Sequence, residues 1–444
     1  MPSLFFLLPP QLELFISPIH SIINTSFEKI FLIELVGESF LSELKNNMIL
    51  ALYTVIVGAI AGLIIWCFIR GMNLGIDFFW SYLPSIIDFK YYTVAVCIIG
   101  GILIGLWKSK YGDSPEELNE VIKKVKTNHR YSYNNIFSSI VSAMLPLVMG
   151  ASVGPEAGLT GIIAGLCTWA SDKVKIFNTE LEEITQIGVA ASLGTIFASP
   201  IFGFVEPLEN EQDSLPKTSK NILYFVAILS SFGIFIFLNR LTHVHSGLHS
   251  IGTAALTDLN YPGIILLIIL GILLSYVFFI SAELSRRIFK NLEGKFVLKG
   301  AIGGLILGIL GTILPLTMFS GEHQIYLLLG NGAELGFVIL ILTSLVKIVL
   351  TNICIESGLK GGHFFPLIFS GTAMGYALSI ILNMNPILSM SLVTSSFLAS
   401  ILRKPIAVVL LLMIIFPMNL IPLMLVATVV ACLFKPPGFL EIEN

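Results

Sequence analysis

Apolar segments alternate with short polar stretches over most of the chain. Those long enough to cross about 30 Å of hydrocarbon as helices lie near residues 47–69, 91–107, 135–150, 221–241, 262–283, 297–318 and 335–354. Inside a membrane only helices and closed barrels satisfy the backbone hydrogen bonds, and segments of this length favour helices. The pattern predicts an all-α polytopic membrane protein with these segments as full spans.

Shorter apolar segments lie between and after these spans, and glycine or proline interrupts them at their boundaries. They cover roughly residues 155–171, 184–198, 200–209, 362–384, 388–402, 405–417 and 420–434. Most are too short or too interrupted for an ordinary span. We expect several of them to be partial helices that are buried in protein, because irregular backbone at membrane depth is tolerated only there.

The interrupted segments repeat in the same order in two halves of the chain. In the first half SVGPEAGLTGIIAG is followed, 45 positions after its Pro155, by FASPIFGF at Pro200. In the second half LKGGHFFPLIFSGTAMG is followed, 39 positions after its Pro366, by LRKPIAVVLL at Pro405. Broken segments at corresponding positions of two halves are typical of transporters that bind their substrate near the bilayer midplane.

Composition agrees with a membrane protein. Of 444 residues, 55% are hydrophobic and 12% charged, and the mean hydropathy is +0.90. The net charge of −3 provides no basic face for a nucleic acid. We expect an interfacial segment over residues 1–45 and one transmembrane domain over 46–438, with repeat 1 at about 46–241 and repeat 2 at about 262–438.

Basic residues predict the orientation in the membrane. Two loops, near 108–130 and 286–299, are rich in lysine and arginine, whereas residues 242–261 contain neither. Because cytoplasmic loops carry an excess of basic residues, the two basic loops should be cytoplasmic and residues 242–261 external. The loop at 205–220 should also be cytoplasmic, because a single span leads from it to the external segment.

The first broken segment carries a carboxylate, Glu156, within the stretch GASVGPEAGLTG. It is the only charged side chain between Arg130 and Asp172. A carboxylate at membrane depth is costly and indicates function; the alternative is a capping or surface carboxylate in an exposed loop. The free N–H groups of a helix N-terminus attract anions. Glu156 would compete with a permeant anion for these groups, and protonating or moving it would open the site.

Glycines accompany both broken segments and remove side chains that would keep an ion from the backbone. They are Gly154 and Gly158 in the first segment, and Gly361 and Gly362 in the second. Pro155 suits the first turn of a helix, where its missing N–H would be unpaired in any case. It also removes one donor from an anion site.

In this order the motifs resemble those of the CLC family of chloride channels and chloride/proton exchangers. GPEAG (154–158) is similar to the family's GxEGP, and GGHFFP (361–366) matches GxFxP from its second glycine. GVAASLGTIFASPIFG (188–203) and ASILRKPIAVVLLL (399–412) look like the family's two helices opened by small residues and proline.

The resemblance covers roughly residues 47–438 and implies a CLC-type fold with two inverted repeats, a homodimer with an anion pathway in each subunit, and no cofactor. It implies that Glu156 is the gating glutamate. The residues it implies for anion binding, mainly through the backbone, are Gly154, Ala157, Gly158, Gly362, His363, Phe364 and Phe365. We therefore expect transport of chloride or a similar small anion, by a channel or a chloride/proton antiporter. Regulatory CBS domains, present in some members, are not expected after KPPGFLEIEN.

Two anion ligands of the family have no clear counterpart. YGDSPEE (111–117) replaces the signature GSGIPE, which puts Gly112 at the position of the anion-coordinating serine. Ser114 would substitute if the loop shifts register. At the family's C-terminal tyrosine, KPPGF offers Gly438 or Phe439.

The proton pathway and the first motif also depart from the family. Counted from Pro200, the inner proton-transfer glutamate falls on Asn210, with Glu209 and Glu211 on either side. In the first motif, Ala157 replaces a glycine and Gly158 a proline. The choice between channel and antiporter therefore stays open, as does the selected anion.

Other candidate chemistry is weaker. His243, His245 and His249 are close enough in sequence for a zinc site, but no fourth ligand is evident and a polar external loop is the simpler interpretation. His363 is either a pH-sensitive group in the pathway or contributes only its backbone. No motif of an intramembrane enzyme is found, so neither a metal nor an enzymatic activity is predicted. A cation-coupled secondary transporter remains the alternative, because broken helices also serve those folds.

Overall fold

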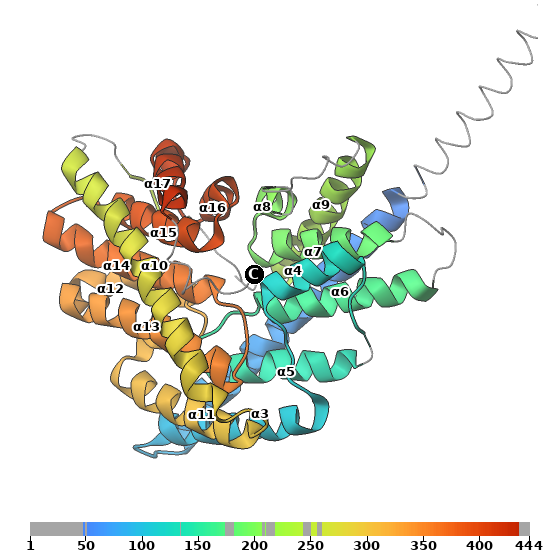
Figure 1. The fold of residues 1–444 in the computed structure, drawn as a ribbon, viewed down its shortest axis with the longest axis horizontal. Helices are drawn as coiled ribbons and strands as arrows, with labels where there is room; N and C mark the ends of the chain where they lie inside the picture. Colours follow the sequence, from blue (N-terminus) through green and yellow to red (C-terminus); the bar gives the residue numbers. More distant parts are fainter. Residues whose placement is uncertain are drawn as a thin grey trace, which may run out of the picture. The chain divides into compact units, whose positions relative to one another are not determined.

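Helices make up almost all of the backbone that the computed structural model describes (Figure 1). The described residues are 48, 51–133, 135–173, 182–206, 209, 218–242, 250–254 and 260–434. The segment 1–45 lies outside them. The chain divides into two compact units, Met1–Tyr53 and Thr54–Asn444, and all candidate site residues belong to the second. The predicted all-α class is confirmed.

Seven helical segments of the described chain are long and apolar enough to cross a membrane. They are Ala51–Ile86, which ends in a π-helical turn η1 (Phe78–Tyr82) and α2 (Leu83–Ile86), then α3 (Tyr92–Tyr111), α9 (Thr218–Leu241), α10 (Tyr261–Lys290), α11 (Phe296–Ile313), α13 (Phe337–Ser357) and α14 (Phe364–Leu382). Six of them coincide with predicted spans, which confirms those predictions.

The predicted full span at 135–150 is wrong. Its helix, α5 (Ile136–Val148), has 13 residues, which at 1.5 Å per residue cover only about 20 Å. The chain turns away at Gly150, whose φ of +84° suits glycine. By contrast α14, expected as a partial helix, has 19 residues, and 83% of its most apolar 18-residue stretch is buried inside the protein.

The remaining helices are shorter or less apolar. They are α4 (Leu118–Asn128), α6 (Glu156–Lys173), α7 (Glu182–Ile196), α8 (Pro200–Val205), α12 (Glu322–Leu335), α15 (Pro386–Leu402), α16 (Pro405–Leu412) and α17 (Ile421–Leu433), with 3₁₀ turns η2 (Pro315–Thr317) and η3 (Met418–Leu420). Proline begins α8, α15 and α16, where its missing N–H has no cost. The predicted partial helices between breakers are therefore present.

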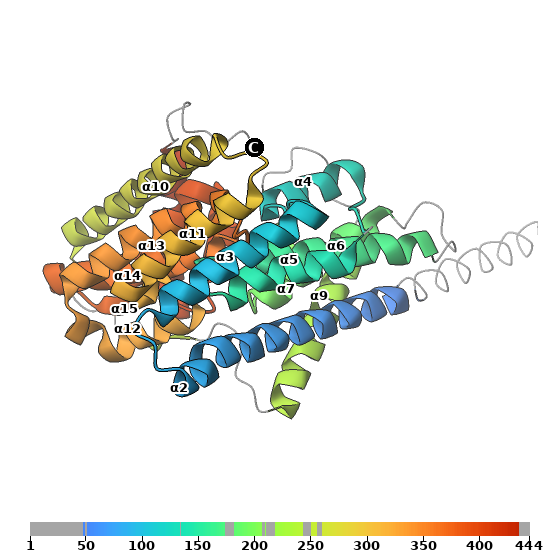
Figure 2. The ribbon, with the colours of Figure 1, turned by 90° about the horizontal axis from the view of Figure 1, so that it is seen from below.

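The two halves of the chain meet along α3 and α11, which lie side by side (Figure 2). Their backbones approach closely at Gly101 and Gly300. A Cβ atom on Gly101 would lie 2.0 Å from the carbonyl oxygen of Gly300, and one on Gly300 would lie 2.1 Å from that of Gly101. Small residues of this kind let membrane helices pack backbone to backbone.

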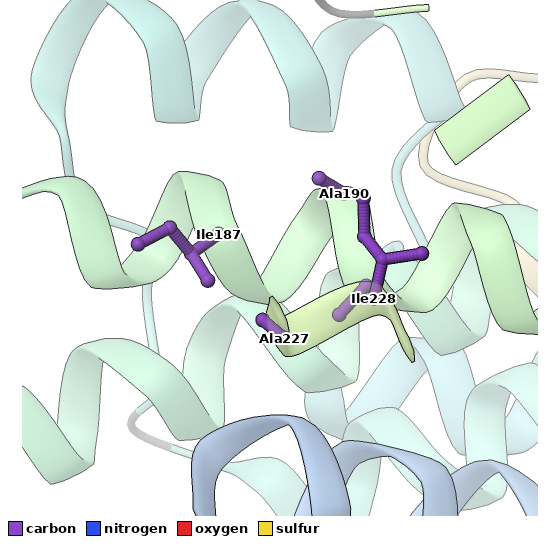
Figure 3. Close-up of a cluster of buried hydrophobic side chains, with 5 residues drawn as sticks. Ile187, Ala190, Ala227 and Ile228 are labelled. Carbon is purple, nitrogen blue, oxygen red and sulfur yellow. The ribbon is translucent and has the colours of Figure 1, made fainter. Parts of the chain in front are cut away.

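Within the first half, small side chains let α7 pack tightly against α9. Figure 3 shows Ile187 and Ala190 of α7 facing Ala227 and Ile228 of α9. Together with Ala191 they form a buried cluster in which the three alanines and Ile228 have no exposed surface. Because α7 also packs on α6, this contact supports the helix that begins with Glu156.

Large apolar side chains cover outer faces of the helices. On α10 they recur at helical spacing: Ile265, Ile269, Leu273 and Ile280 are each about half exposed. In water such a continuous apolar face would be unusual, whereas in a bilayer it faces hydrocarbon. The protein is thus a multi-pass integral membrane protein.

Candidate anion site

The broken segments of the two halves meet at Gly154 and Gly362. The N–H of each glycine donates to the carbonyl oxygen of the other, and both N···O distances are 2.7 Å. The segments lie 208 residues apart in the chain, counted from Glu156 to Phe364. This bridge brings the start of α6 to the start of α14.

The carboxylate of Glu156 lies at the N-terminus of α14. Glu156 is the first residue of α6, and its Oε1 accepts a hydrogen bond of 2.8 Å from the backbone N–H of Phe364, the first residue of α14. The residue has no exposed surface. Among the described residues, its Oε2 has no hydrogen-bond partner. Glu156 is therefore a buried carboxylate that caps a helix of the other half, and the alternative of an exposed loop is excluded.

Gly154 and Gly362 make room for this carboxylate. A Cβ atom on Gly154 would lie 2.0 Å from Oε2 of Glu156, and one on Gly362 would lie 2.0 Å from its Cδ. The space that was predicted to admit an ion is thus filled by the side chain of Glu156. The N–H groups of the two glycines are engaged in their mutual bridge, so they do not face an anion as predicted.

Gly158 was predicted to leave room for an ion, but its neighbour is a side chain of another helix. A Cβ atom there would lie 2.4 Å from Cβ of Ala143 on α5 and 3.9 Å from Cγ of Pro115. Its missing side chain therefore allows α5 to pack on α6. Like that of Ala157, its N–H belongs to the first turn of α6, and the role of both amides in anion binding stays a prediction.

Aromatic rings surround the start of α14. Phe197, just before the second break of the first half, stacks on Phe365 with ring centroids 5.0 Å apart and lies 5.5 Å from Phe364. His363 stacks on Phe364 at 5.2 Å and lies 5.7 Å from Phe278 of α10. The residue that bonds to Glu156, Phe364, is therefore packed among aromatic rings at the start of α14. Phe197 carried no special signal in the sequence.

A second carboxylate caps a helix of the other half in a similar way. Both oxygens of Glu209 accept backbone N–H groups from the first turn of α16, at 2.8 Å from Ile406 and 2.6 Å from Ala407. Nearby, Lys404 pairs with Glu206 at 2.6 Å. The Glu209 carboxylate thus caps the start of α16, and its predicted role in proton transfer stays a prediction.

Several predicted positions lie outside the described residues: Asn210, Glu211, His243, His245, His249, Gly438 and Phe439. Within the described part of the chain, no group of three or more His, Cys, Asp or Glu residues is placed to hold a metal ion.

The inner candidates Gly112 and Ser114 lie in the turn between α3 and α4. Gly112 ends α3 with a φ of +97°, and a Cβ atom there would meet nothing within 4 Å. Ser114 is half-buried and precedes Pro115 through a cis peptide bond. Pro115 is the neighbour of Gly158 described above, so this turn lies next to the first turn of α6.

A buried lysine was missed at the sequence level. Lys347 on α13 has no exposed surface, and its ammonium donates to the carbonyl oxygens of the turn before α12: Leu316, Thr317, Met318 and Phe319 at 3.3, 3.2, 3.0 and 2.9 Å. The N–H of Phe319 donates in turn to Gly150, just before the first break. A lone basic residue within the predicted span 335–354 was the available signal.

Residues 100–435 of the chain match the protein family described as voltage gated chloride channel. The match covers well over half of the chain and includes both broken segments. The chain therefore belongs to this family, as the motifs predicted.

Individual relatives are distant but similar over most of their length. A protein of Salmonella newport (strain SL254) named "Putative ion-transport protein YfeO" is 22% identical over 342 residues, which are 75% of this chain and 81% of that protein. The structure is similar to that of a CLC-type fluoride/proton antiporter, with a TM-score of 0.71 and 21% identity over 87% of this chain and 95% of the other.

A slow cyanobacterial Cl⁻/H⁺ antiporter gives a TM-score of 0.70 and 19% identity over 86% of this chain and 93% of the other. At these identities the two structural neighbours establish the fold. The predicted CLC-type fold is confirmed.

Proposed function

We propose that this protein moves chloride or a similar small anion across the membrane along a path that Glu156 gates. The observation that carries the proposal is the hydrogen bond from the Phe364 N–H to the buried carboxylate of Glu156. A helix N-terminus presents unpaired N–H groups and a partial positive charge, which together suit a small anion. The carboxylate holds this place in the closed state.

The gate works by competition between two anions for the same donor. When the carboxylate leaves, the Phe364 N–H loses a charge-assisted bond of about 1.5–3 kcal/mol. A permeant anion that enters can replace this bond, so exchange between carboxylate and anion has a small net cost. Protonating Glu156 removes the charge that the helix N-terminus attracts, and favours the anion.

The Phe364 and Phe365 amides are the proposed donors on the α14 side, and those of Ala157 and Gly158 on the α6 side. Gly154 and Gly362 contribute space rather than donors, because their N–H groups bond to each other. His363 precedes these donors and packs between aromatic rings, so its backbone position is fixed.

The same proposal includes a homodimer in which each subunit has its own anion path. Sedimentation equilibrium in density-matched detergent should give twice the mass of 48.5 kDa. A monomeric mass at all protein concentrations would contradict the dimer without affecting the proposed path.

Anion efflux from liposomes tests the function. Purified protein in chloride-loaded vesicles should release chloride when valinomycin clamps the voltage, and Glu156→Ala should keep or increase that release while removing its dependence on pH. Glu293→Gln, at an exposed carboxylate in the turn between α10 and α11, is the matched control and should behave as wild type. The proposal would be refuted if vesicles that contain correctly folded protein showed no chloride flux.

Recording protons in the same vesicles distinguishes channel from antiporter. Coupled proton movement that Glu156→Gln abolishes, with anion flux still measurable, would identify an antiporter gated at Glu156. Chloride flux without any proton movement in wild type would identify a channel. Proton coupling that persists unchanged in Glu156→Gln would contradict the gate assignment.

A further inference from the structure

The carboxylate of Asp113 lies between two lysines at the end of the helices where the basic loops gather. Its Oδ1 is 2.7 Å from Nζ of Lys108, in the last turn of α3, and its Oδ2 is 2.9 Å from Nζ of Lys360, in the turn before α14. The Lys108 side chain is 1% exposed, that of Lys360 25% and that of Asp113 43%. One face of the carboxylate is therefore open to solvent, while one of its two cations is buried.

These three groups join the two halves next to the candidate path. Asp113 separates Gly112 from Ser114, the two inner candidates from the sequence, and Lys360 is two residues before Gly362. Pro115, two residues after Asp113, lies against the first turn of α6 at Gly158. The arrangement parallels that of Glu156, because in both places a carboxylate from the first half occupies a positively charged position next to the start of α14.

The lysines outnumber the carboxylate that they bind. Burial raises the pKa of Asp113, but the charges of Lys108 and Lys360 outweigh this and lower it to about 2. Asp113 thus stays ionised at any physiological pH. Two further charges act on this cluster: Lys299 acts on Lys108, and Glu356 interacts with Lys360. Without Asp113, the buried ammonium of Lys108 would lack its closest counter-ion, and an uncompensated buried charge is costly.

We propose that Lys108 and Lys360 form a second anion site, at the basic end of the path, in which the Asp113 carboxylate takes the place of the permeant anion. The inference rests on the proposed function and deepens it. At this site a small inorganic anion displaces the carboxylate by concentration, because the carboxylate does not become protonated, whereas at Glu156 protonation favours the anion. The path thus has two carboxylate gates that respond to different conditions.

A purely structural role for Asp113 makes a different prediction. If the carboxylate only ties the turn after α3 to the turn before α14, its removal weakens the fold and leaves anion binding unchanged. If it stands in for an anion, its removal creates an anion site. Equilibrium binding separates the two roles.

Chloride binding to the purified full-length protein should be measured by isothermal titration calorimetry, with gluconate keeping the ionic strength constant. We expect Asp113→Asn to bind chloride about tenfold more tightly than wild type, the effect of one added charge-assisted contact. Asp113→Asn combined with Lys360→Met should lose this gain. Asp172→Asn is the matched control, because Asp172 pairs with Arg130 at 2.5 Å on an exposed surface, and it should leave chloride binding unchanged.

The Glu156→Ala background separates this inference from the proposed function. If Glu156→Ala binds chloride but adding Asp113→Asn contributes no further binding, the second site is refuted and the gate at Glu156 stands. If Asp113→Asn gains chloride binding while Glu156→Ala gains none, the gate is refuted instead. Should Asp113→Asn not fold, Lys360→Met alone must still raise the chloride concentration for half-maximal flux; an unchanged value would overturn the second site.

Discussion

Replacing Lys347 by methionine tests how the buried turn before α12 is held next to the first broken segment. The turn carries four consecutive carbonyl groups, from Leu316 to Phe319, within 3.3 Å of the Lys347 ammonium. Methionine has a similar length and no charge, so Lys347→Met leaves these carbonyls without their donor at a side-chain position that has no exposed surface.

The expected loss of stability follows from these contacts. An ammonium has three protons for these four carbonyl oxygens, so the four contacts are not all full hydrogen bonds. The two shortest are those to Phe319 and Met318, at 2.9 and 3.0 Å. Two charge-assisted bonds contribute roughly 3–6 kcal/mol to the free energy of unfolding. Part of their loss is offset, because the variant no longer buries a charged ammonium. We therefore expect the free energy of unfolding to fall by about 3 kcal/mol, the low end for breaking a buried charged contact.

The assay is reversible unfolding in mixed micelles with a denaturing detergent, followed by near-UV circular dichroism. Lys290→Met is the control, because Lys290 is an exposed lysine at the end of α10, and surface changes of this kind cost within about 0.5 kcal/mol. A loss below about 1 kcal/mol for Lys347→Met, or one equal to that of the control, would refute the argument that this lysine holds the turn.

Three further predictions concern the site. Gly362→Ala places a Cβ atom 2.0 Å from Cδ of Glu156, in the space that a carboxylate or an anion needs. Chloride flux in liposomes should fall about tenfold or more, whereas Gly330→Ala, where a Cβ meets nothing within 4 Å, should not change it. Thr351→Val removes the 3.1 Å contact to Ser152 in the first break, and detergent unfolding should report a loss of about 1 kcal/mol. The pKa of Asp113 is about 4 in the unfolded chain and about 2 in the folded protein, so its carboxylate stabilises the folded state above pH 4. Acid titration from pH 4 to 2 should remove this contribution to stability in the wild type. It should remove none in Asp113→Asn.

The parts of the site that depend on local sequence could be predicted. Glycine, proline and a lone carboxylate within twelve residues sufficed to place a helix start at Glu156, and GGHFFP placed another near Phe364. The span at 135–150 was misjudged because average hydropathy does not register that Gly150 turns the chain away.

The contacts that define the site could not be predicted, because they join residues about 200 positions apart. Nothing near Gly154 indicates that its N–H bonds to Gly362, or that Glu156 accepts from Phe364. The function assigned to a glycine was equally uncertain from sequence: Gly362 faces the carboxylate, whereas Gly158 faces Ala143 on a neighbouring helix. Which atom a missing Cβ would meet is a property of the fold.

Anomalous diffraction from bromide tests the central claim most directly. Crystals of Glu156→Ala grown in bromide should show an anomalous peak within hydrogen-bond distance of the Phe364 N–H, at the place that the Glu156 carboxylate occupies in wild type. Wild-type crystals under the same conditions should lack this peak. The claim is that the carboxylate and a permeant anion compete for this helix N-terminus. A Glu156→Ala crystal without bromide at the start of α14 would contradict it.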